Sequence, residues 1–247
     1  GTFEIKPYGW IKKQLEIQMN GLSGSLDTVW RDIADSKWIG GKGEGWERFP
    51  YWLDGYIPLC YLLDDKNGID KCKKYIDCIL SFQKEDGWIC PFEKTSGSEY
   101  VSWAIHLIAK VLTVYYRYSK DERIPSVVYR ILKNYHEMLK SGEMKFKGWG
   151  KCRWFECFIP INFIYHIYKE PWIKDLARFL KDNGLDYSTL KEHWKTPLNR
   201  WRYETHIVNL TMMLKSEAVS FEILGEEYHD IAEDLIAYLD KYNGTAY

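Results

Sequence analysis

Residues 101–115, VSWAIHLIAKVLTVY, decide the fold class of this chain. The apolar residues that share one helical face of this stretch are Val101, Ile105, Ile108, Leu112 and Tyr115. Their i, i+3, i+4 spacing is typical of an α-helix that buries one side against a core. The same spacing recurs along most of the chain, and no segment alternates apolar and polar residues for long enough to indicate a β-strand. The sequence therefore predicts an all-α protein.

Helical periodicity continues on both sides of this stretch. We expect further helices at about residues 8–19, 50–63, 69–80, 125–139, 155–168, 172–180, 204–215 and 228–242. Ser98 and Asp121 are typical helix starts, and Pro125 suits a first helical turn. Gly184 and Gly225 are typical helix ends.

The connections between these helices alternate in character. Some are short and plain, whereas others are longer and rich in glycine, tryptophan and charge. The long connections are 34–49, 84–99, 142–154 and 193–203. Such alternation is typical of helical hairpins set in a ring, a toroid whose ligand site lies on the rim of elaborated loops. We therefore expect one α/α-barrel domain over residues 1–247, with these four loops on one rim.

The bulk composition limits the class of partner. The chain has 247 residues, of which 46% are apolar and 28% are charged, which is typical of a globular protein. Its formal net charge of −1 gives no electrostatic reason to expect binding to nucleic acid or to an anionic membrane. No uninterrupted apolar run is long enough to span a bilayer. We expect neither nucleic acid nor a membrane as partner.

The cysteines predict buried free thiols. They are Cys60, Cys72, Cys78, Cys90, Cys152 and Cys157, and they form no CxxC pair and no metal-finger spacing. Cysteine at apolar helical positions behaves as a small hydrophobic residue, so we expect a reducing compartment such as the cytoplasm and no structural zinc. The chain begins without Met, which leaves a removed export signal, and hence a periplasmic or secreted location, as an alternative.

The aromatic content favours carbohydrate as the ligand. With 12 Trp and 19 Tyr, aromatic residues make up 17% of the chain. An indole or phenol offers a flat apolar face with a polar handle, and carboxylates and arginines beside it can hold hydroxyl groups by directional hydrogen bonds. Such mixtures occur at 41–65, 148–156 and 199–206. The candidate substrate-binding residues are Arg48, Tyr51, Trp52, Asp54, Trp149, Arg153, Trp201 and His206.

Each of these residues also has a plainer interpretation. A single ring can be core filler, a single charge can be a helix cap or an ion pair, and His206 can be a structural residue at the start of an apolar stretch. Glu47 and Asp54 lie seven positions apart with Pro50 between them, so a glycosidase carboxylate pair is one possibility whose geometry the sequence leaves open. The chain has no phosphate-binding glycine loop, HExxH or GxSxG motif. The catalytic residues remain unassigned.

Three stretches resemble a known family. They are PYGWIKKQLEIQMNGLSGSLD at 7–27, WIGGKGEGWERFPYWLDGYIPLCYLLDD at 38–65 and ETHIVNLTMMLK at 204–215. They resemble the catalytic domain of the β-L-arabinofuranosidase family of glycoside hydrolases. The resemblance implies an (α/α)6 toroid and hydrolysis of β-L-arabinofuranosides or related plant-cell-wall sugars. Through its setting, His206 matches a sugar-binding histidine of that family. The residues that match the family signature are Arg48, Tyr51, Trp52 and Asp54.

The resemblance also implies a metal that these residues do not supply. The family is similar in using a zinc ion held by one Glu and three Cys, with a zinc-bound Cys as nucleophile and a separate Glu as acid/base. The chain has no adjacent Cys-Cys and no Glu-x-Cys, so no metal ligand is carried over and zinc is expected only for the full-length family member. We expect the domain to continue beyond Tyr247, with the zinc/cysteine catalytic segment missing from this chain.

An incomplete ring has a consequence for partners. Periodicity gives about nine helices, fewer than an (α/α)6 ring contains. We expect an open edge with apolar residues Ile231, Leu235 and Leu239, which favours a homo-oligomer through that edge. Two alternatives to the hydrolase remain: a non-catalytic carbohydrate-binding toroid, and an enzyme like the unsaturated uronyl hydrolases, which would use an Asp base without a metal.

Overall fold

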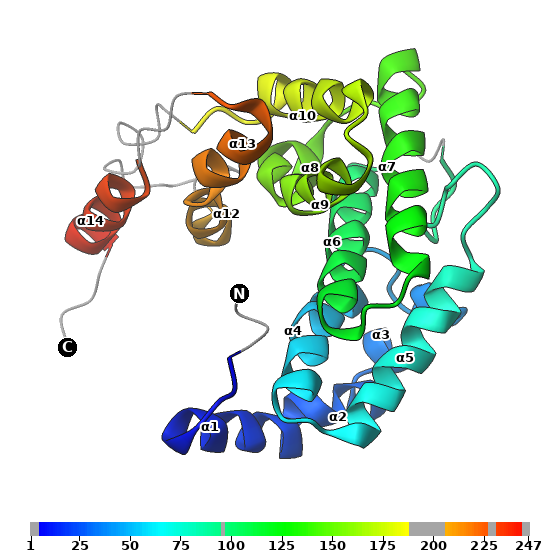
Figure 1. Cartoon of the computed structure of the whole chain (residues 1–247), viewed down its shortest axis with the longest axis vertical. Helices are drawn as coiled ribbons and strands as arrows, with labels where there is room; N and C mark the ends of the chain where they lie inside the picture. Colours follow the sequence, from blue (N-terminus) through cyan, green and yellow to red (C-terminus); the bar gives the residue numbers. More distant parts are fainter. Residues whose placement is uncertain (1–4, 95–96, 188–205, 227–230, 244–247) are drawn as a thin grey trace. The chain divides into compact units, whose positions relative to one another are not determined.

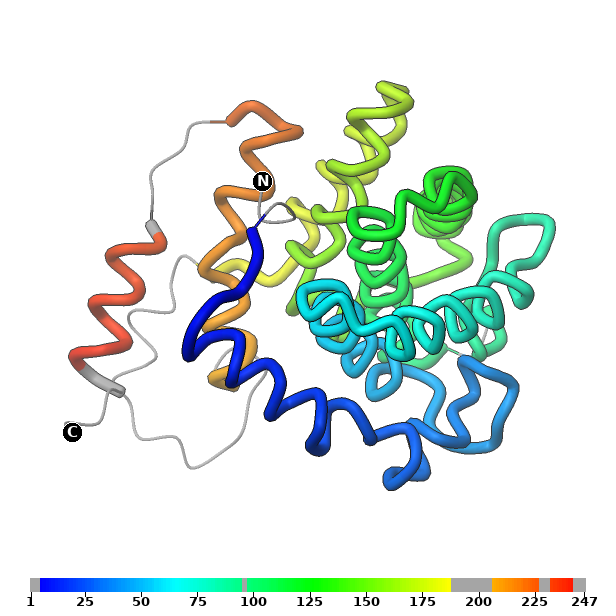
Figure 2. Tube along the Cα trace, turned by 60° about the horizontal axis from the view of Figure 1, so that its bottom comes forward, coloured from blue at the N-terminus to red at the C-terminus, as the bar shows by residue number. Residues whose placement is uncertain are grey.

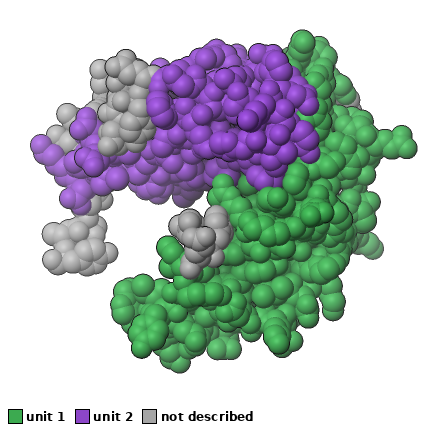
Figure 3. Space-filling model, in the orientation of Figure 1, with its two compact units in different colours: residues 1–145 green, residues 146–247 purple. Residues whose placement is uncertain are grey.

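The structure is a computed structural model that describes residues 5–94, 97–187, 206–226 and 231–243. Within these ranges every regular element is an α-helix or a 3-10 helix, so the predicted all-α class is confirmed (Figure 1). The chain forms two compact units, residues 1–145 and 146–247, coloured separately in Figure 3. The single barrel domain and the (α/α)6 ring stay predictions.

Unit 1 is built from seven α-helices in its described residues. They are α1 (Gly9–Asn20), α2 (Leu22–Val29), α3 (Arg31–Ala34), α4 (Arg48–Leu62), α5 (Lys66–Ser81), α6 (Val101–Ser119) and α7 (Arg123–Ser141). A 3-10 helix, Lys37–Ile39, lies between α3 and α4. Helix α6 packs against both α4 and α7, and α5 packs against α4 (Figure 2). The expected helices of this unit are confirmed, with ends shifted by a few residues.

Helix α6 is the centre of the core of unit 1. All five residues of its predicted apolar face are at most 3% exposed. Trp103, Leu107 and Val111, which point away from that face, are buried as well. A helix that is apolar nearly all round is one that other elements cover on several sides, and α4 and α7 provide that cover. The stretch that predicts the fold class is therefore also the part around which the unit packs.

Unit 2 contains shorter helices. They are α8 (Gly148–Cys152), a 3-10 helix (Trp154–Cys157), α9 (Phe158–Tyr168), α10 (Pro171–Asn183), α12 (Ile207–Met213), α13 (Ser216–Leu224) and α14 (Ile231–Asn243). Helix α13 packs against both α9 and α10. As predicted, α10 ends at Gly184 and α13 ends at Gly225, whose φ of 64° lies in the left-handed region that glycine favours.

The expected open apolar edge on α14 is wrong for the residues that can be checked. Leu235 is only 3% exposed and Leu239 is half-buried, so these two side chains do not form an exposed apolar edge. The side chain of Ile231 lies outside the described residues. Association with a second copy of the chain through this edge stays a prediction, and the exposure of α14 does not support it.

The two elaborated loops of unit 1 come together. A Cβ atom built on Gly45 would lie 3.5 Å from the Cβ of Pro91, so loops 34–49 and 84–99 are in close contact. This contact agrees with a common side for the two loops, and their place on the rim of a toroid stays a prediction. Loop 142–154 belongs mostly to unit 2, and loop 193–203 lies outside the described residues, so their place on the rim stays a prediction.

Two features predicted from the sequence can be compared with the structure: the state of the cysteines and the length of the apolar segments. All six cysteines are free, and five are buried while Cys78 is half-buried, which confirms the expected buried free thiols. Helices α4 and α5 bring the sulfur atoms of Cys60 and Cys72 to 3.9 Å from each other. None of the helices in the described part of the chain combines the length and the apolar character that crossing a bilayer requires.

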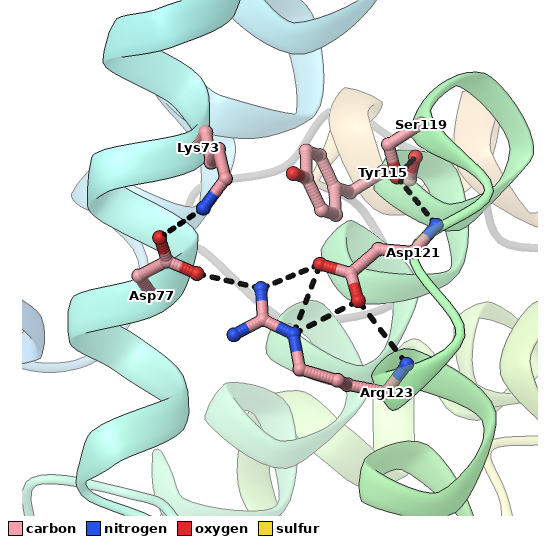
Figure 4. A network of polar contacts seen from close by, with 6 residues as sticks. All are labelled: Lys73, Asp77, Tyr115, Ser119, Asp121 and Arg123. Atoms are coloured by element: carbon pink, nitrogen blue, oxygen red, sulfur yellow. Dashed lines mark hydrogen bonds and ion pairs between the residues drawn. The ribbon is translucent and has the colours of Figure 1, made fainter.

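An ion network ties the turn between α6 and α7 to α5 (Figure 4). Asp121 accepts hydrogen bonds from the backbone N–H of Arg123 at 3.1 Å and from its Nε at 2.9 Å, as expected for a helix start. The Nη2 of Arg123 lies 2.6 Å from a carboxylate oxygen of Asp77. Lys73 completes the network with a 2.6 Å contact to the other oxygen of Asp77. The network joins α5 to the start of α7 and to the turn before it by charges on the surface of unit 1.

Replacing Arg123 with glutamine is expected to lower the free energy of unfolding by only about 0.5–1 kcal/mol at neutral pH, because solvent screens this exposed network. Hydrogen bonding from Arg123 lowers the pKa of Asp121, and Lys73 and then Arg123 lower that of Asp77, below the ordinary value of 3.8. Because the folded-state pKa values are lowered, the stabilisation is present above the ordinary pKa and is lost as the pH falls through the folded values.

Urea unfolding at neutral and at acidic pH checks this expectation. The difference between the protein and the Arg123→Gln variant should shrink as the pH falls below 3.8. Lys74→Gln is the matched control, since Lys74 is exposed on α5 and forms no ion pair with a described residue. An equal loss from the control, or a difference that grows in acid, would contradict the assigned role of the network.

Candidate functional site

Two segments of unit 2 meet through a set of polar side chains. One segment is 149–156, which covers most of α8 and the 3-10 helix after it, and the other is 206–215, which contains α12. The Nε of Arg153 donates a 2.7 Å hydrogen bond to Oδ1 of Asn209. Arg153 is only 4% exposed and Asn209 is fully buried. A buried guanidinium held by an amide is a fixed, charged feature of this part of the protein.

Aromatic rings lie on one side of the guanidinium. The Cζ of Arg153 is 4.6 Å from the centre of the Trp149 ring, within the range of a cation–π contact. The His206 ring meets Trp149 edge to face, with ring centres 6.0 Å apart. Both rings are half-buried, so part of each is open to a ligand. We call Trp149, Arg153, His206 and Asn209 the Trp149 cluster.

A buried ion pair lies in the same two segments. The Nζ of Lys215 contacts Oε1 of Glu156, whose side chain is fully buried while that of Lys215 is 36% exposed. A carboxylate removed from water needs such a partner, because an isolated buried charge is strongly unfavourable. Glu156 is therefore engaged as a structural charge that holds the two segments together.

Short elements place these residues. Trp149 lies in α8, Arg153 is the residue that ends α8, and Glu156 lies in the 3-10 helix Trp154–Cys157 that follows. His206 and Asn209 are three positions apart, the spacing of neighbours on a helical face. The three residues of the first segment each contact a partner on the second.

The structure brings together three of the eight candidate residues, Trp149, Arg153 and His206. Asn209 completes the group and is a residue that the sequence reasoning missed. The signal that could have found it was its position as a polar residue three places after His206 within the apolar stretch HIVNLTMMLK. Trp201, a fourth candidate from this region, lies outside the described residues.

Two candidates on α4 are held by contacts within unit 1. Arg48 forms an ion pair with Asp32 and lies over the ring of Trp30, at 5.2 Å from its centre. Trp52 is buried, donates its indole N–H to the backbone oxygen of Ser23 at 2.8 Å, and stacks on another ring of α4 at 4.6 Å. These contacts agree with the plainer interpretation of both residues, an ion pair and a core ring.

The remaining candidates on α4 face α6. Tyr51 lies 5.9 Å from the ring of Trp103, and Asp54 pairs with Lys110 at 2.8 Å. Glu47 accepts the indole N–H of Trp103 at 2.8 Å. Glu47 and Asp54 are separated by about 10 Å of helical rise, and each is already engaged with α6. The geometry thus gives no support to this pair as the two carboxylates of a glycosidase.

Glu44 shows how the charges before α4 are used. Its carboxylate accepts the backbone N–H groups of Glu47 at 2.7 Å and Arg48 at 3.2 Å, so it satisfies donors at the start of the helix. Burial raises the pKa of Glu44, and the hydrogen bonds from the backbone oppose that rise. The crowding of charge at 44–48 therefore has a structural explanation.

The zinc set implied by the family resemblance does not fit the described residues. Among them, no three His, Cys, Asp or Glu side chains come together as metal ligands. We derive no step through zinc from this structure. What the described geometry offers is a binding surface, the Trp149 cluster. Comparisons of the chain with family models, with curated proteins and with solved structures give no match.

Proposed function

We propose that this protein binds β-L-arabinofuranosides or related plant-cell-wall sugars at the Trp149 cluster and belongs functionally with the glycoside hydrolases. The observation that carries the proposal is a half-buried indole fixed beside a buried guanidinium and an imidazole. A furanose ring has an apolar C–H face bordered by hydroxyl groups, and an indole can stack on that face. The resemblance of 204–215 to the β-L-arabinofuranosidase family supports the same assignment.

Each residue of the cluster has a role in this proposal. Trp149 stacks on the sugar, and His206 donates to or accepts from a hydroxyl group through its ring nitrogens. Arg153 holds the indole in place from a buried position, and Asn209 fixes the orientation of the guanidinium through its 2.7 Å hydrogen bond. The cluster therefore binds and orients the sugar. A preformed arrangement of this kind lowers the cost of ordering side chains upon binding.

We also propose that the helices form hairpins of an (α/α)6 toroid. The contacts between α4 and α5 and between α6 and α7, which are consecutive in the chain, support hairpin units. The free, buried thiols support a reducing compartment such as the cytoplasm.

A non-catalytic sugar-binding protein is the second candidate. It is favoured by the engagement of the buried or half-buried acids Glu47, Asp54 and Glu156 in contacts with Trp103, Lys110 and Lys215. A hydrolase needs an acid/base and a nucleophile or water-activating carboxylate, and these three acids already have structural partners. Turnover separates the two candidates, because both predict binding.

Trp149→Ala is expected to weaken the binding of an aryl β-L-arabinofuranoside by about two- to tenfold, because it removes the stacking surface. Titration calorimetry measures the affinity, and release of the aryl group measures turnover. Trp30→Ala is the matched control, because Trp30 also lies under an arginine, Arg48, but contacts no histidine ring among the described residues. Its affinity should equal that of the unchanged protein.

The results of these assays distinguish the candidate functions. Binding with turnover, weakened only by Trp149→Ala, supports the hydrolase. Binding without turnover supports the sugar-binding protein. An aryl uronide preferred over the furanoside favours the enzyme of uronyl hydrolase type. No saturable sugar binding, or equal losses for both tryptophan variants, overturns the proposal.

A further inference from the structure

Unit 1 contains a cavity that the proposed sugar site does not use. It has a volume of about 190 Å³ and lies where loops 34–49 and 84–99 meet. Its lining includes the buried residues Trp38 and Ile89 and the more exposed rings of Phe82 and Phe92. Pockets for small molecules are mostly apolar with a few polar groups that fix orientation. The walls of this cavity suit a ligand with one small apolar ring.

One polar group in the lining has no partner. Trp38 is 1% exposed, and its indole N–H finds no acceptor among the described residues. The buried indoles of Trp52, Trp88 and Trp103 in the same unit all donate to an oxygen at 2.8–2.9 Å. A buried donor without an acceptor is unfavourable, and a ligand oxygen that accepts from it removes that cost.

The position of Trp38 is fixed by the backbone around it. The residue lies in the 3-10 helix Lys37–Ile39, where its backbone N–H bonds to Oγ of Ser36 at 3.3 Å. Gly40 ends this helix with a φ of 81°, in the left-handed region that glycine adopts without strain. The indole is thus held in place before any ligand arrives.

The opposite wall is fixed in the same way. The backbone N–H of Lys84 bonds to the oxygen of Trp88 at 2.8 Å, and the indole of Trp88 donates to the backbone oxygen of Phe92 at 2.9 Å. These two bonds hold the segment that carries Ile89 and Pro91 against the cavity. The cavity is therefore built into the loop structure, which favours a specific ligand.

Two lysines give the mouth of the cavity a positive charge. Lys37 and Lys84 both line it and are exposed, and neither forms an ion pair with a carboxylate in the part of the chain that the structure describes. One acid, Glu93, also lies in the lining, which leaves an excess of one positive charge. Exposed ammonium groups that form no ion pair attract a ligand anion.

We propose that this cavity binds a small aromatic carboxylate. The ring lies among Ile89, Phe82 and Phe92, the carboxylate meets Lys37 and Lys84, and an oxygen on the ring accepts the indole N–H of Trp38. This ligand class satisfies each of the three observations: an apolar wall, a buried donor without an acceptor, and two lysines without ion pairs. The site is separate in chemistry from the Trp149 cluster and does not depend on the sugar-binding proposal.

The test uses the full chain and para-hydroxybenzoate as the probe. Calorimetry should show saturable binding, and the indole N–H proton resonance of Trp38, assigned by its loss in Trp38→Phe, should shift on titration. Para-hydroxybenzamide lacks the charge and benzoate lacks the ring oxygen, so both should bind more weakly. Lys37→Met and Lys84→Met should each weaken the carboxylate by about two- to fivefold, the range for an exposed ion pair.

Lys74→Met is the matched control, since Lys74 is an exposed lysine of unit 1 away from the cavity lining. Its affinity for the probe should be unchanged. The proposal is overturned by the absence of saturable binding, by equal affinity for the amide and the carboxylate, or by equal losses in the control and the cavity variants. If Trp38→Phe fails to fold, the two lysine variants and the amide still decide the outcome.

Discussion

Lys215→Met is expected to lower the free energy of unfolding by about 3 kcal/mol, because it takes a cation away from a buried carboxylate. Glu156 is fully buried, and Lys215 forms an ion pair with it. Removing one partner of a buried pair costs about 3–5 kcal/mol, and the 36% exposure of Lys215 places this case at the lower end. Guanidinium unfolding at neutral pH measures the loss.

A double-mutant cycle isolates the pair from other effects. Adding Glu156→Gln to Lys215→Met removes the uncompensated charge, so the double variant should be more stable than the sum of the single losses by about 1–3 kcal/mol. Lys181→Met is the matched control in unit 2, because Lys181 pairs with Glu226 and both are about one-third exposed. That variant should lose less than about 1 kcal/mol. Equal losses for Lys215→Met and Lys181→Met would show that the Glu156 pair is not a special buried contact.

The same variants connect stability with the proposed site. Glu156 lies on the segment that carries Trp149 and Arg153, and Lys215 lies on the segment that carries Asn209. If the ion pair holds the segments together, Lys215→Met should also weaken sugar binding, and the double variant should recover part of it. A stability loss with unchanged sugar affinity would separate the ion pair from the function of the cluster.

The long helices were predictable because their apolar faces repeat over several turns. Helix α6 has 19 residues, and its predicted face is buried throughout. Several short helices escaped prediction. Helices α3 and α8 have four and five residues, too few to show a period. In α13 two of the buried residues are Ser216 and Ser220, so burial there does not follow the apolar pattern.

The candidate site was predictable only in part. Arginine and tryptophan near each other in sequence identified Trp149 and Arg153, but the same pattern also selected Arg48 and Trp52, which are an ion pair and a core ring. Composition cannot separate these cases, because the partner that decides each role is distant in sequence. For Arg153 that partner is Asn209, 56 positions away.

The cavity in unit 1 could not be found from sequence at all. Its lining joins residues 37–38 to residues 82–93, which are brought together only by the packing of two loops. The decisive feature is that the indole N–H of Trp38 has no acceptor in the described part of the chain, and a missing hydrogen bond leaves no mark in a sequence. Most buried donors have partners, so the sequence alone predicts a satisfied indole here.

Gly87→Ala is expected to destabilise the fold by at least about 3 kcal/mol, since it combines backbone strain with a clash that no side chain can relieve. Gly87 has a φ of 94°, and a Cβ atom built on it would lie 2.3 Å from the backbone oxygen of Arg130. That oxygen belongs to α7, whose backbone is fixed by its own helical bonds. Thermal and denaturant unfolding measure the loss.

Gly142→Ala separates strain from clash, because Gly142 also has a positive φ, 77°, but a Cβ there would meet nothing within 4 Å. Gly142→Ala should lower the free energy of unfolding only by the backbone strain, about 1–2 kcal/mol. An equal loss at both glycines would show that the close approach to α7 is unimportant.

The clash at Gly87 has a second consequence, because Gln83 donates to the backbone oxygens of Gly87 and Val127 and so fixes the loop that forms one wall of the cavity. Gly87→Ala should therefore also weaken para-hydroxybenzoate binding, while Gly142→Ala should leave it unchanged.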